Sequence, residues 1–271
     1  MNAEPNSGDA HAPAEIARLV ESMGVAKAQN DVVTELVLAV LAGAFISLGA
    51  LFYLVVITGA GLGFGVTRLL GGLAFSLGLI LVVVAGAELF TGNNLLAMAW
   101  ASRRIGTREL LRNWMLSYFG NVVGCLGTVA LAIGAGVARL GGGAVGETTL
   151  RVAGGKAGLS LLESFTRGVL CNVLVCLAVW LAMGARSVTD KIMAIIFPIT
   201  AFTALGFEHS IANWFLLPFG MALDRSGTIS VGDVARNLAA VTAGNIIGGS
   251  LLVAGVYWLA YLRGARAQAP R

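Results

Sequence analysis

Residues 86–93 read Gly-Ala-Glu-Leu-Phe-Thr-Gly-Asn, and residues 206–213 read Gly-Phe-Glu-His-Ser-Ile-Ala-Asn. The two octapeptides share the frame G-x-E-x-x-x-x-N and lie 120 positions apart. Each contains one acidic residue, Glu88 or Glu208, within an otherwise apolar stretch. Each copy lies inside an apolar stretch that is too long for one membrane crossing. The repeated frame therefore indicates two equivalent interruptions.

The apolar stretches around these octapeptides are too long for one ordinary membrane crossing. Arg68 and Arg103 enclose 34 residues whose only charge is Glu88, and Lys191 and Asp224 enclose 32 residues whose only full charge is Glu208. A bilayer core of about 30 Å needs roughly 20 helical residues. We predict that both spans are broken near their middles.

The composition is that of an integral membrane protein. The chain has 271 residues, of which 57% are hydrophobic and 12% charged, and its mean hydropathy is +0.85. The 37 glycines favour helices that pack closely through small residues. We predict an all-α membrane protein with six transmembrane helices, at about 37–57, 69–100, 114–137, 161–183, 192–222 and 238–262.

A second repeat relates the third and sixth spans. Residues 120–124 read Gly-Asn-Val-Val-Gly and residues 244–248 read Gly-Asn-Ile-Ile-Gly. Two halves of three spans each enter the membrane from opposite sides, which predicts a 3+3 inverted repeat with its pathway where the interrupted helices meet. The expected units are a tail or amphipathic helix at 1–30, a channel domain at 31–262 with repeats 31–137 and 160–262, a looser joining segment at 138–159, and a tail at 263–271.

The basic residues indicate orientation rather than nucleic-acid binding, because they are spread over the loops. With both termini in the cytoplasm, 11 Lys and Arg residues lie inside and 7 outside, which fits the positive-inside rule. The three cysteines have no C-x-x-C spacing and are expected to be packing residues. We expect no metal, no cofactor and no enzymatic activity.

The breaks predict a site for an anion. The second half-helices are expected to begin near Thr91 and Ser210, with their positive dipole ends toward the membrane centre. Glu88 and Glu208 could handle protons, but a structural role in accepting free N–H groups is favoured. Thr91 could line the pore or cap its half-helix. Asn121, Asn172 and Asn245 could join helices or reach the pore.

His209 is the strongest single candidate for function, because an ionisable ring inside a membrane span usually marks a substrate or proton path. The apolar residues near the breaks are more often packing than a gate: Phe75, Leu79, Leu89, Phe90 and Phe202. Lys156 lies in the joining segment, where a solvated charge is expected.

These motifs together resemble the formate/nitrite transporter family, nearest its formate channel. The resemblance covers about residues 15–262 and rests on 75–81, 88–91, Lys156 with Asn172, 175–180 and 206–213. It implies an aquaporin-like fold with helices 2 and 5 interrupted, assembled as a homopentamer in the bacterial inner membrane with one pore per protomer.

The resemblance also implies roles for matched residues. Leu79, Leu89 and Phe90 would form the cytoplasmic constriction, and Phe75 and Phe202 the periplasmic one. Thr91 would lie on a mobile loop, with His209 central, Asn172 as its partner and Lys156 attracting anions. Two features leave the substrate open: Gly92-Asn93-Asn94 is closer to nitrite-type members, and the segment between spans 5 and 6 is short.

The expected function is a channel for small monovalent anions, formate first, with nitrite, hydrosulfide, acetate or lactate as further candidates. His209 would transfer a proton to the anion at the apolar constrictions, with Thr91, Asn172, Lys156 and Glu208 assisting. The alternatives are a channel for neutral solutes on the same fold and a membrane scaffold or sensor that transports nothing.

Overall fold

The computed structural model describes residues 10–264 and is all-helical over that range. Six helices are long and apolar enough to cross a membrane, which confirms the predicted fold class. They are Val32–Ile57, Phe64–Gly86, Thr107–Gly134, Leu161–Gly184, Val188–Leu205 and Val231–Tyr261. The first nine residues and most of the predicted tail at 263–271 lie outside the described residues.

The spans are made of elements that often continue into one another. In chain order they are α1 (Pro13–Ala28), α2 (Val32–Ile57), α3 (Phe64–Ile80), η1 (Leu81–Gly86), α4 (Phe90–Asn93), η2 (Asn94–Leu96), α5 (Ala97–Ala101), α6 (Thr107–Gly134), η3 (Val137–Gly143), α7 (Ala144–Ala157), α8 (Leu161–Gly184), α9 (Val188–Leu205), α10 (Ser210–Leu223), α11 (Val231–Ile246), η4 (Ile247–Gly255) and α12 (Val256–Tyr261). Helix α2 packs against α3 and α6, and α8 packs against α9 and α11, so the two halves repeat their neighbours.

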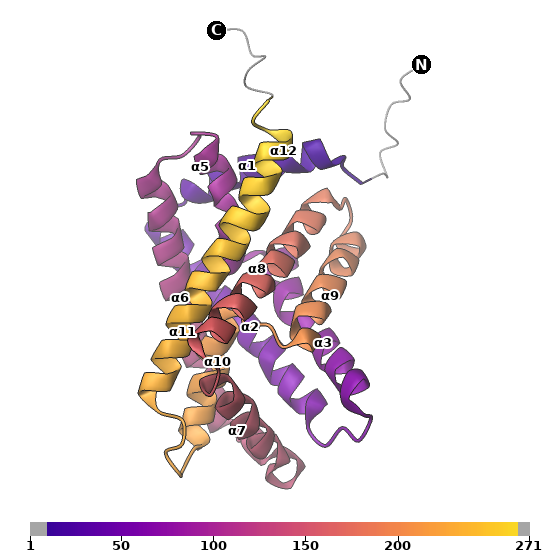
Figure 1. Cartoon of the computed structure of the whole chain (residues 1–271), viewed down its shortest axis with the longest axis vertical. Helices are drawn as coiled ribbons and strands as arrows, with labels where there is room; N and C mark the ends of the chain where they lie inside the picture. Colours follow the sequence, from indigo (N-terminus) through magenta and orange to yellow (C-terminus); the bar gives the residue numbers. More distant parts are fainter. Residues whose placement is uncertain (1–9, 265–271) are drawn as a thin grey trace.

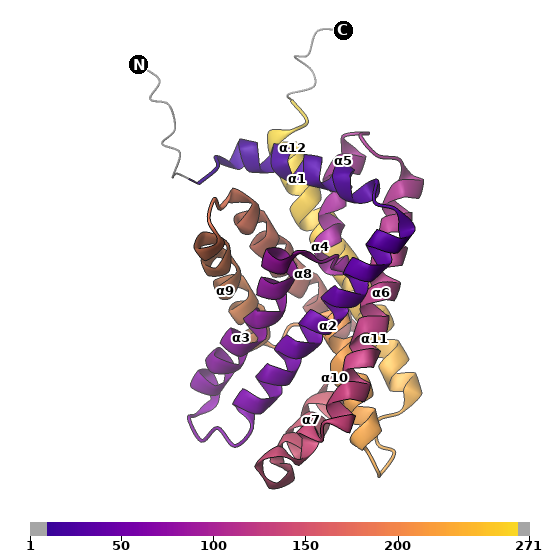
Figure 2. The same cartoon turned by 180° about the vertical axis from the view of Figure 1, so that it is seen from behind.

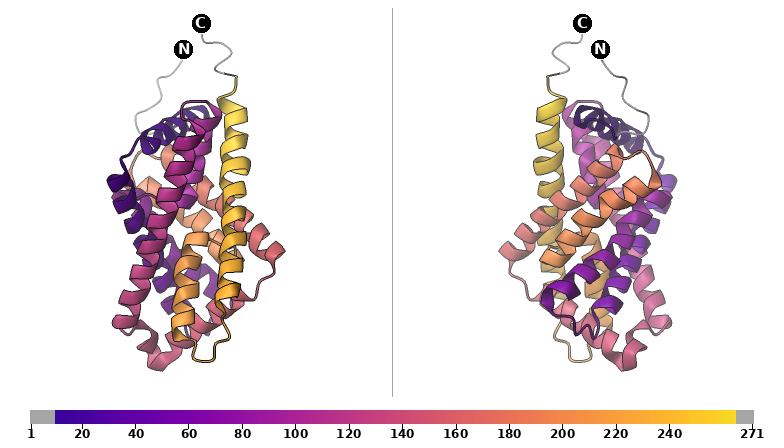
Figure 3. Two further views of the ribbon diagram at one scale, coloured as in Figure 1. Left: turned by 90° about the vertical axis from the view of Figure 1, so that its left-hand side faces the viewer. Right: turned by 90° about the vertical axis from the view of Figure 1, so that its right-hand side faces the viewer.

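The bundle has two distinct ends. Helix α1 lies across the end of the bundle at which α12 ends, and α7 lies at the opposite end (Figures 1, 2 and 3). We call these the α1 end and the α7 end. Helix α1 buries one face, including Ile16, Ala17 and Val20, against the bundle, so the predicted N-terminal helix is ordered.

Both predicted interruptions are present. Gly86 and Gly206 adopt left-handed φ angles of 85° and 73°, which a glycine tolerates without the steric cost of a Cβ atom. The chain is extended at Leu89 and His209, and α4 and α10 begin at the next residue. The backbone N–H of Glu88 donates to Leu38 O, and that of Glu208 donates to Arg167 O, both at 3.2 Å. Each break is therefore held by the helix beside it.

The repeated G-N-x-x-G motif sets close helix contacts. A Cβ atom at Gly124 would overlap Val40 O of α2, and one at Gly248 would overlap Val169 O of α8. Glycine at these positions lets the backbones approach, as expected where lipid provides little drive for association.

The sequence-based prediction was wrong for the joining segment at 138–159. Left-handed glycines, Gly141 to Gly143, are confined to η3, and the rest forms α7. Helix α7 packs on α10, where a Cβ atom at Gly220 would overlap that of Ala153. The segment is thus a second short helix against the bundle, opposite α1.

Candidate functional site

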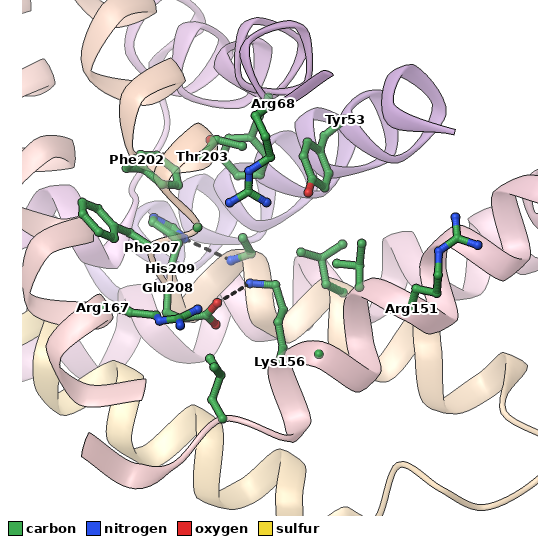
Figure 4. A pocket seen from close by; sticks show the side chains of 17 residues that line it. Tyr53, Arg68, Arg151, Lys156, Arg167, Phe202, Thr203, Phe207, Glu208 and His209 are labelled. Carbon is green, nitrogen blue, oxygen red and sulfur yellow. Dashed lines mark hydrogen bonds and ion pairs between the residues drawn. The ribbon is translucent and has the colours of Figure 1, made fainter. Parts of the chain in front are cut away.

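A cavity of about 270 Å³ opens at the α7 end and reaches the break in the fifth span. Its walls come from α2, α3, α7, α8, α9 and α10, and His209 lies among its lining residues. Figure 4 shows basic side chains around the cavity, with the His209 ring beside Phe202. The structure therefore brings together the break, the imidazole and a positively charged mouth.

Phe75 and Phe202 line the same cavity as His209. Their ring centroids are 5.5 Å apart in an edge-to-face arrangement, and both side chains are buried. Phe202 also stacks on the His209 ring at 6.0 Å. An apolar pair in this place can exclude water around an ion, as the predicted constriction requires.

The hydrogen bonds of His209 assign its tautomer. The backbone N–H of Ala212 donates to Nδ1 at 3.0 Å, so Nδ1 is an acceptor and caps α10. In the neutral ring the proton is therefore on Nε2, which lies 2.9 Å from Thr91 Oγ1. His209, in the second break, can therefore donate its Nε2 proton to Thr91, in the first break.

Thr91 connects His209 to Asn172. The Asn172 amide donates to Thr91 O at 3.2 Å and to Asn245 O at 2.7 Å, so it contacts the break through Thr91 rather than through the imidazole. Its Oδ1 atom is buried and has no hydrogen-bond partner among the described residues. Thr91 does not cap α4, because the cap position is Leu89; its hydroxyl serves the contact to His209.

Lys156 is not the solvated charge that the sequence suggested. It lies in the last turn of α7, and its Nζ atom is 2.9 Å from Glu208 Oε1, with the two side chains 16% and 4% exposed. Asn213 donates to the other Glu208 oxygen at 2.6 Å and to Asn237 at 2.8 Å. Glu208 is a bound counter-ion in a closed network.

The same network occurs at the first break. Lys27 of α1 lies 2.9 Å from Glu88 Oε2, and Asn93 donates to Glu88 at 2.8 Å and to Asn113 at 3.0 Å. The sequence reasoning missed Lys27. The sequence does place a lysine on a short helix before each break, Lys27 and Lys156. The two lysines are not recognised as equivalent, because they lie at different distances along the chain from Glu88 and Glu208.

Asn121 and Asn245 tie the breaks to the third and sixth spans. The Asn121 amide donates to Ala39 O and Glu88 O and accepts from Phe90 N. The Asn245 amide makes the corresponding three bonds, to Gly168 O, Glu208 O and Ser210 N. Both residues satisfy backbone groups that lipid could not, which agrees with the structural interpretation.

A second cavity of about 450 Å³ opens at the α1 end and is lined by Leu79, Leu89 and Lys27. Two of the three residues expected to form this constriction thus line one cavity. Phe90 differs: its ring packs edge-on against Trp114 at 6.4 Å and Tyr118 at 4.9 Å. Because the Phe90 backbone begins α4, its side chain is turned toward α6 and does not line this cavity.

The comparisons with known proteins agree with this architecture. The sequence profile described as formate/nitrite transporter matches residues 14–259. The chain belongs to the formate/nitrite transporter family. This transporter is 41% identical to the formate channel FocA of Escherichia coli over 276 residues, covering 95% of the chain and 97% of that protein. It is 38% identical to a probable formate transporter of Methanothermobacter thermautotrophicus, covering 93% and 97%.

A solved structure supports the fold of this transporter directly. It is a pentameric formate channel with formate bound, with a TM-score of 0.80 and 40% sequence identity over 86% of this chain and 98% of that chain. An ion channel of the same family aligns with a TM-score of 0.83 at 29% identity.

Within residues 10–264 of the transporter, no group of three metal-binding side chains occurs, and all three cysteines are free and buried.

Proposed function

We propose that the protein is a membrane channel for small monovalent anions, with formate as its principal substrate. The single observation that carries this is the His209–Thr91 hydrogen bond between the two breaks, beside the Phe75–Phe202 pair. The similarity to the formate channel FocA and to a solved pentameric formate channel with formate bound supports the substrate and a homopentamer. We place the α1 end in the cytoplasm of a bacterial inner membrane, following the excess of Lys and Arg expected on that side.

Neutralising the anion makes passage through the apolar rings possible. A bare carboxylate between Phe75 and Phe202 costs several kcal/mol in lost hydration. Protonating an acid with a pKa near 4 costs about 4 kcal/mol at pH 7. The two costs are of the same order, so a route through the neutral acid is competitive.

His209 mediates the proton transfer in this proposal. When formate reaches Nε2, a proton from the cavity binds Nδ1, the Ala212 bond breaks and the formate balances the new charge. The Nε2 proton then moves to a formate oxygen, which leaves formic acid and a neutral ring. Water exchanges the remaining Nδ1 proton for one on Nε2, and Ala212 caps the ring again. Thr91 holds Nε2 between transport events.

The test is formate uptake into proteoliposomes with a pH indicator inside. His209→Phe removes both ring nitrogens and is expected to abolish the coupling of formate to protons. His209→Asn is the control for folding, since its Oδ1 atom occupies the place of Nδ1 and can accept the Ala212 N–H while the side chain carries no exchangeable ring proton. Unchanged formate flux, proton coupling and pH dependence in His209→Phe would refute the proton role.

The same preparations separate the other functions. Competition between formate, nitrite and hydrosulfide ranks the anions. Osmotic swelling with glycerol detects a channel for neutral solutes, and a scaffold or sensor gives no flux in any assay.

A further inference from the structure

The basic residues of the cavity at the α7 end differ in whether a carboxylate balances their charge. Lys156 is paired with Glu208 at 2.9 Å, and Arg167 lies 3.6 Å from Glu163. Arg68 also lines the cavity, yet it forms no ion pair with any residue in 10–264. Arg151 of α7 also lines the cavity without a carboxylate partner among the described residues, and it donates to Thr148 within its own helix. Of the two arginines without a carboxylate partner, Arg68 is the one that contacts the fifth span, through Ala204 O.

Arg68 is held in one orientation. Its Nε atom donates to Ala204 O at 2.7 Å, near the end of α9. Its guanidinium carbon lies 5.6 Å from the centre of the Phe64 ring. A Cβ atom at Gly206 would lie 2.6 Å from Nη2, so the glycine of the second break leaves space for the guanidinium. Because the Arg68 side chain is already held in place, less side-chain conformational entropy is lost when an anion binds to it.

The two terminal nitrogens of Arg68 face the cavity, toward Lys156 and Tyr53 (Figure 4). Neither of these nitrogens has a hydrogen-bond partner in the described part of the chain, and the same holds for the Tyr53 hydroxyl. The Tyr53 ring packs edge-on against Phe75 with centroids 6.5 Å apart. Three unused donors thus converge beside the Phe75–Phe202 pair.

From these contacts we infer that Arg68 and Tyr53 form a recruitment site for a planar anion with two oxygen atoms, which fills before the anion reaches Phe75 and Phe202. This rests on the proposed function. The terminal nitrogens of a guanidinium present parallel N–H groups that match the two oxygens of a carboxylate or nitrite. Hydrosulfide has one acceptor atom, so it is attracted by the charge of Arg68 but cannot accept both parallel N–H bonds.

The test is Arg68→Lys, which keeps the charge and removes the paired donors. Initial uptake of formate and of hydrosulfide is measured in proteoliposomes at low salt. The KM for formate is expected to rise about tenfold, as for the loss of one charge-assisted hydrogen bond, while that for hydrosulfide changes less than twofold. Arg225→Lys, in the exposed turn after α10, is the matched control.

Tyr53→Phe is a milder second variant that keeps the ring against Phe75. It is expected to raise the KM for formate about threefold and to leave hydrosulfide unchanged. If neither variant changes the KM for formate, or if both anions are affected equally, the recruitment site is wrong. If the wild-type protein carries no anion at all, the proposed function fails instead, so the two failures are distinguishable.

Discussion

The two breaks share a scaffold but differ in chemistry. Each has a lysine–glutamate pair, two asparagines beside the glutamate and a further asparagine on the backbone. The N-cap residue of the helix that follows the break differs, however: it is Leu89 before α4 and His209 before α10. Two positions on, Thr91 corresponds to Ile211. The comparison teaches that the repeat provides the frame, and that two substitutions within it provide the polar contact.

The largest effect should come from the asparagines that hold the breaks. Asn245→Leu leaves Ser210 N, Gly168 O and Glu208 O without this partner. At about 1 to 3 kcal/mol for each buried group, we expect a loss of roughly 4 kcal/mol in stability. Thermal unfolding in detergent measures it. Asn121→Leu should lose a similar amount; a large difference would show that the breaks are not equivalent.

The lysine–glutamate pairs come next. Lys156→Met leaves Glu208 buried without its counter-ion, which is expected to cost about 3 kcal/mol. Lys27→Met should cost a comparable amount at Glu88. Lys156→Met combined with Glu208→Gln should recover much of the loss, as measured by unfolding temperature. Failure of the second change to recover stability would contradict the pairing.

Exchanging the residues that differ tests where the chemistry lies. The double variant Leu89→His with His209→Leu should reduce formate uptake about 100-fold, equivalent to about 2.7 kcal/mol. The moved imidazole would face Ile211, which has no hydroxyl. Adding Ile211→Thr supplies one and should restore part of the uptake. Equal uptake by the double variant and the wild type would show that His209 has no special position.

The smallest expected effect on stability is at the turn after α10. This turn is closed by hydrogen bonds to the Asp224 carboxylate, whereas the corresponding turn after α5 has no acidic residue in that place. Hydrogen bonds from the Ser226 hydroxyl and then from Ile229 N lower the pKa of Asp224 below its ordinary value. Its stabilising effect is therefore complete above the ordinary carboxyl pKa and is lost as pH falls through the lowered one. Asp224→Asn should lower the unfolding temperature slightly from pH 5 to 8, and this difference should shrink in stronger acid.

Much of this fold could be predicted because the signals are local. The frame around Glu88 and Glu208 located both breaks, and the segment around Asn121 and Asn245 located the helices that hold them. Contacts between distant segments were less accessible. Lys27 lies 61 positions before its glutamate, whereas Lys156 lies 52 before its own. Only the folding of α1 and α7 back onto the bundle makes these pairs equivalent.

The direction of single side chains was the second gap. Phe90 stands beside Leu89 in sequence, yet its ring packs on Trp114 and Tyr118. One step along an extended backbone reverses the side-chain direction. The apolar pattern therefore predicted that both residues would be buried, without showing which one lines the cavity.

The hydrogen bond between Thr91 and His209 joins two segments separated by 118 positions, one from each half of the chain. In the proposed function, neither half alone could transfer a proton to a passing anion, because the His209–Thr91 contact needs both. Synthesis of the first three spans would leave an inert membrane anchor, and conductance would begin only when the later spans dock. On the proposed function, a partly synthesised chain would therefore conduct no acid across the membrane.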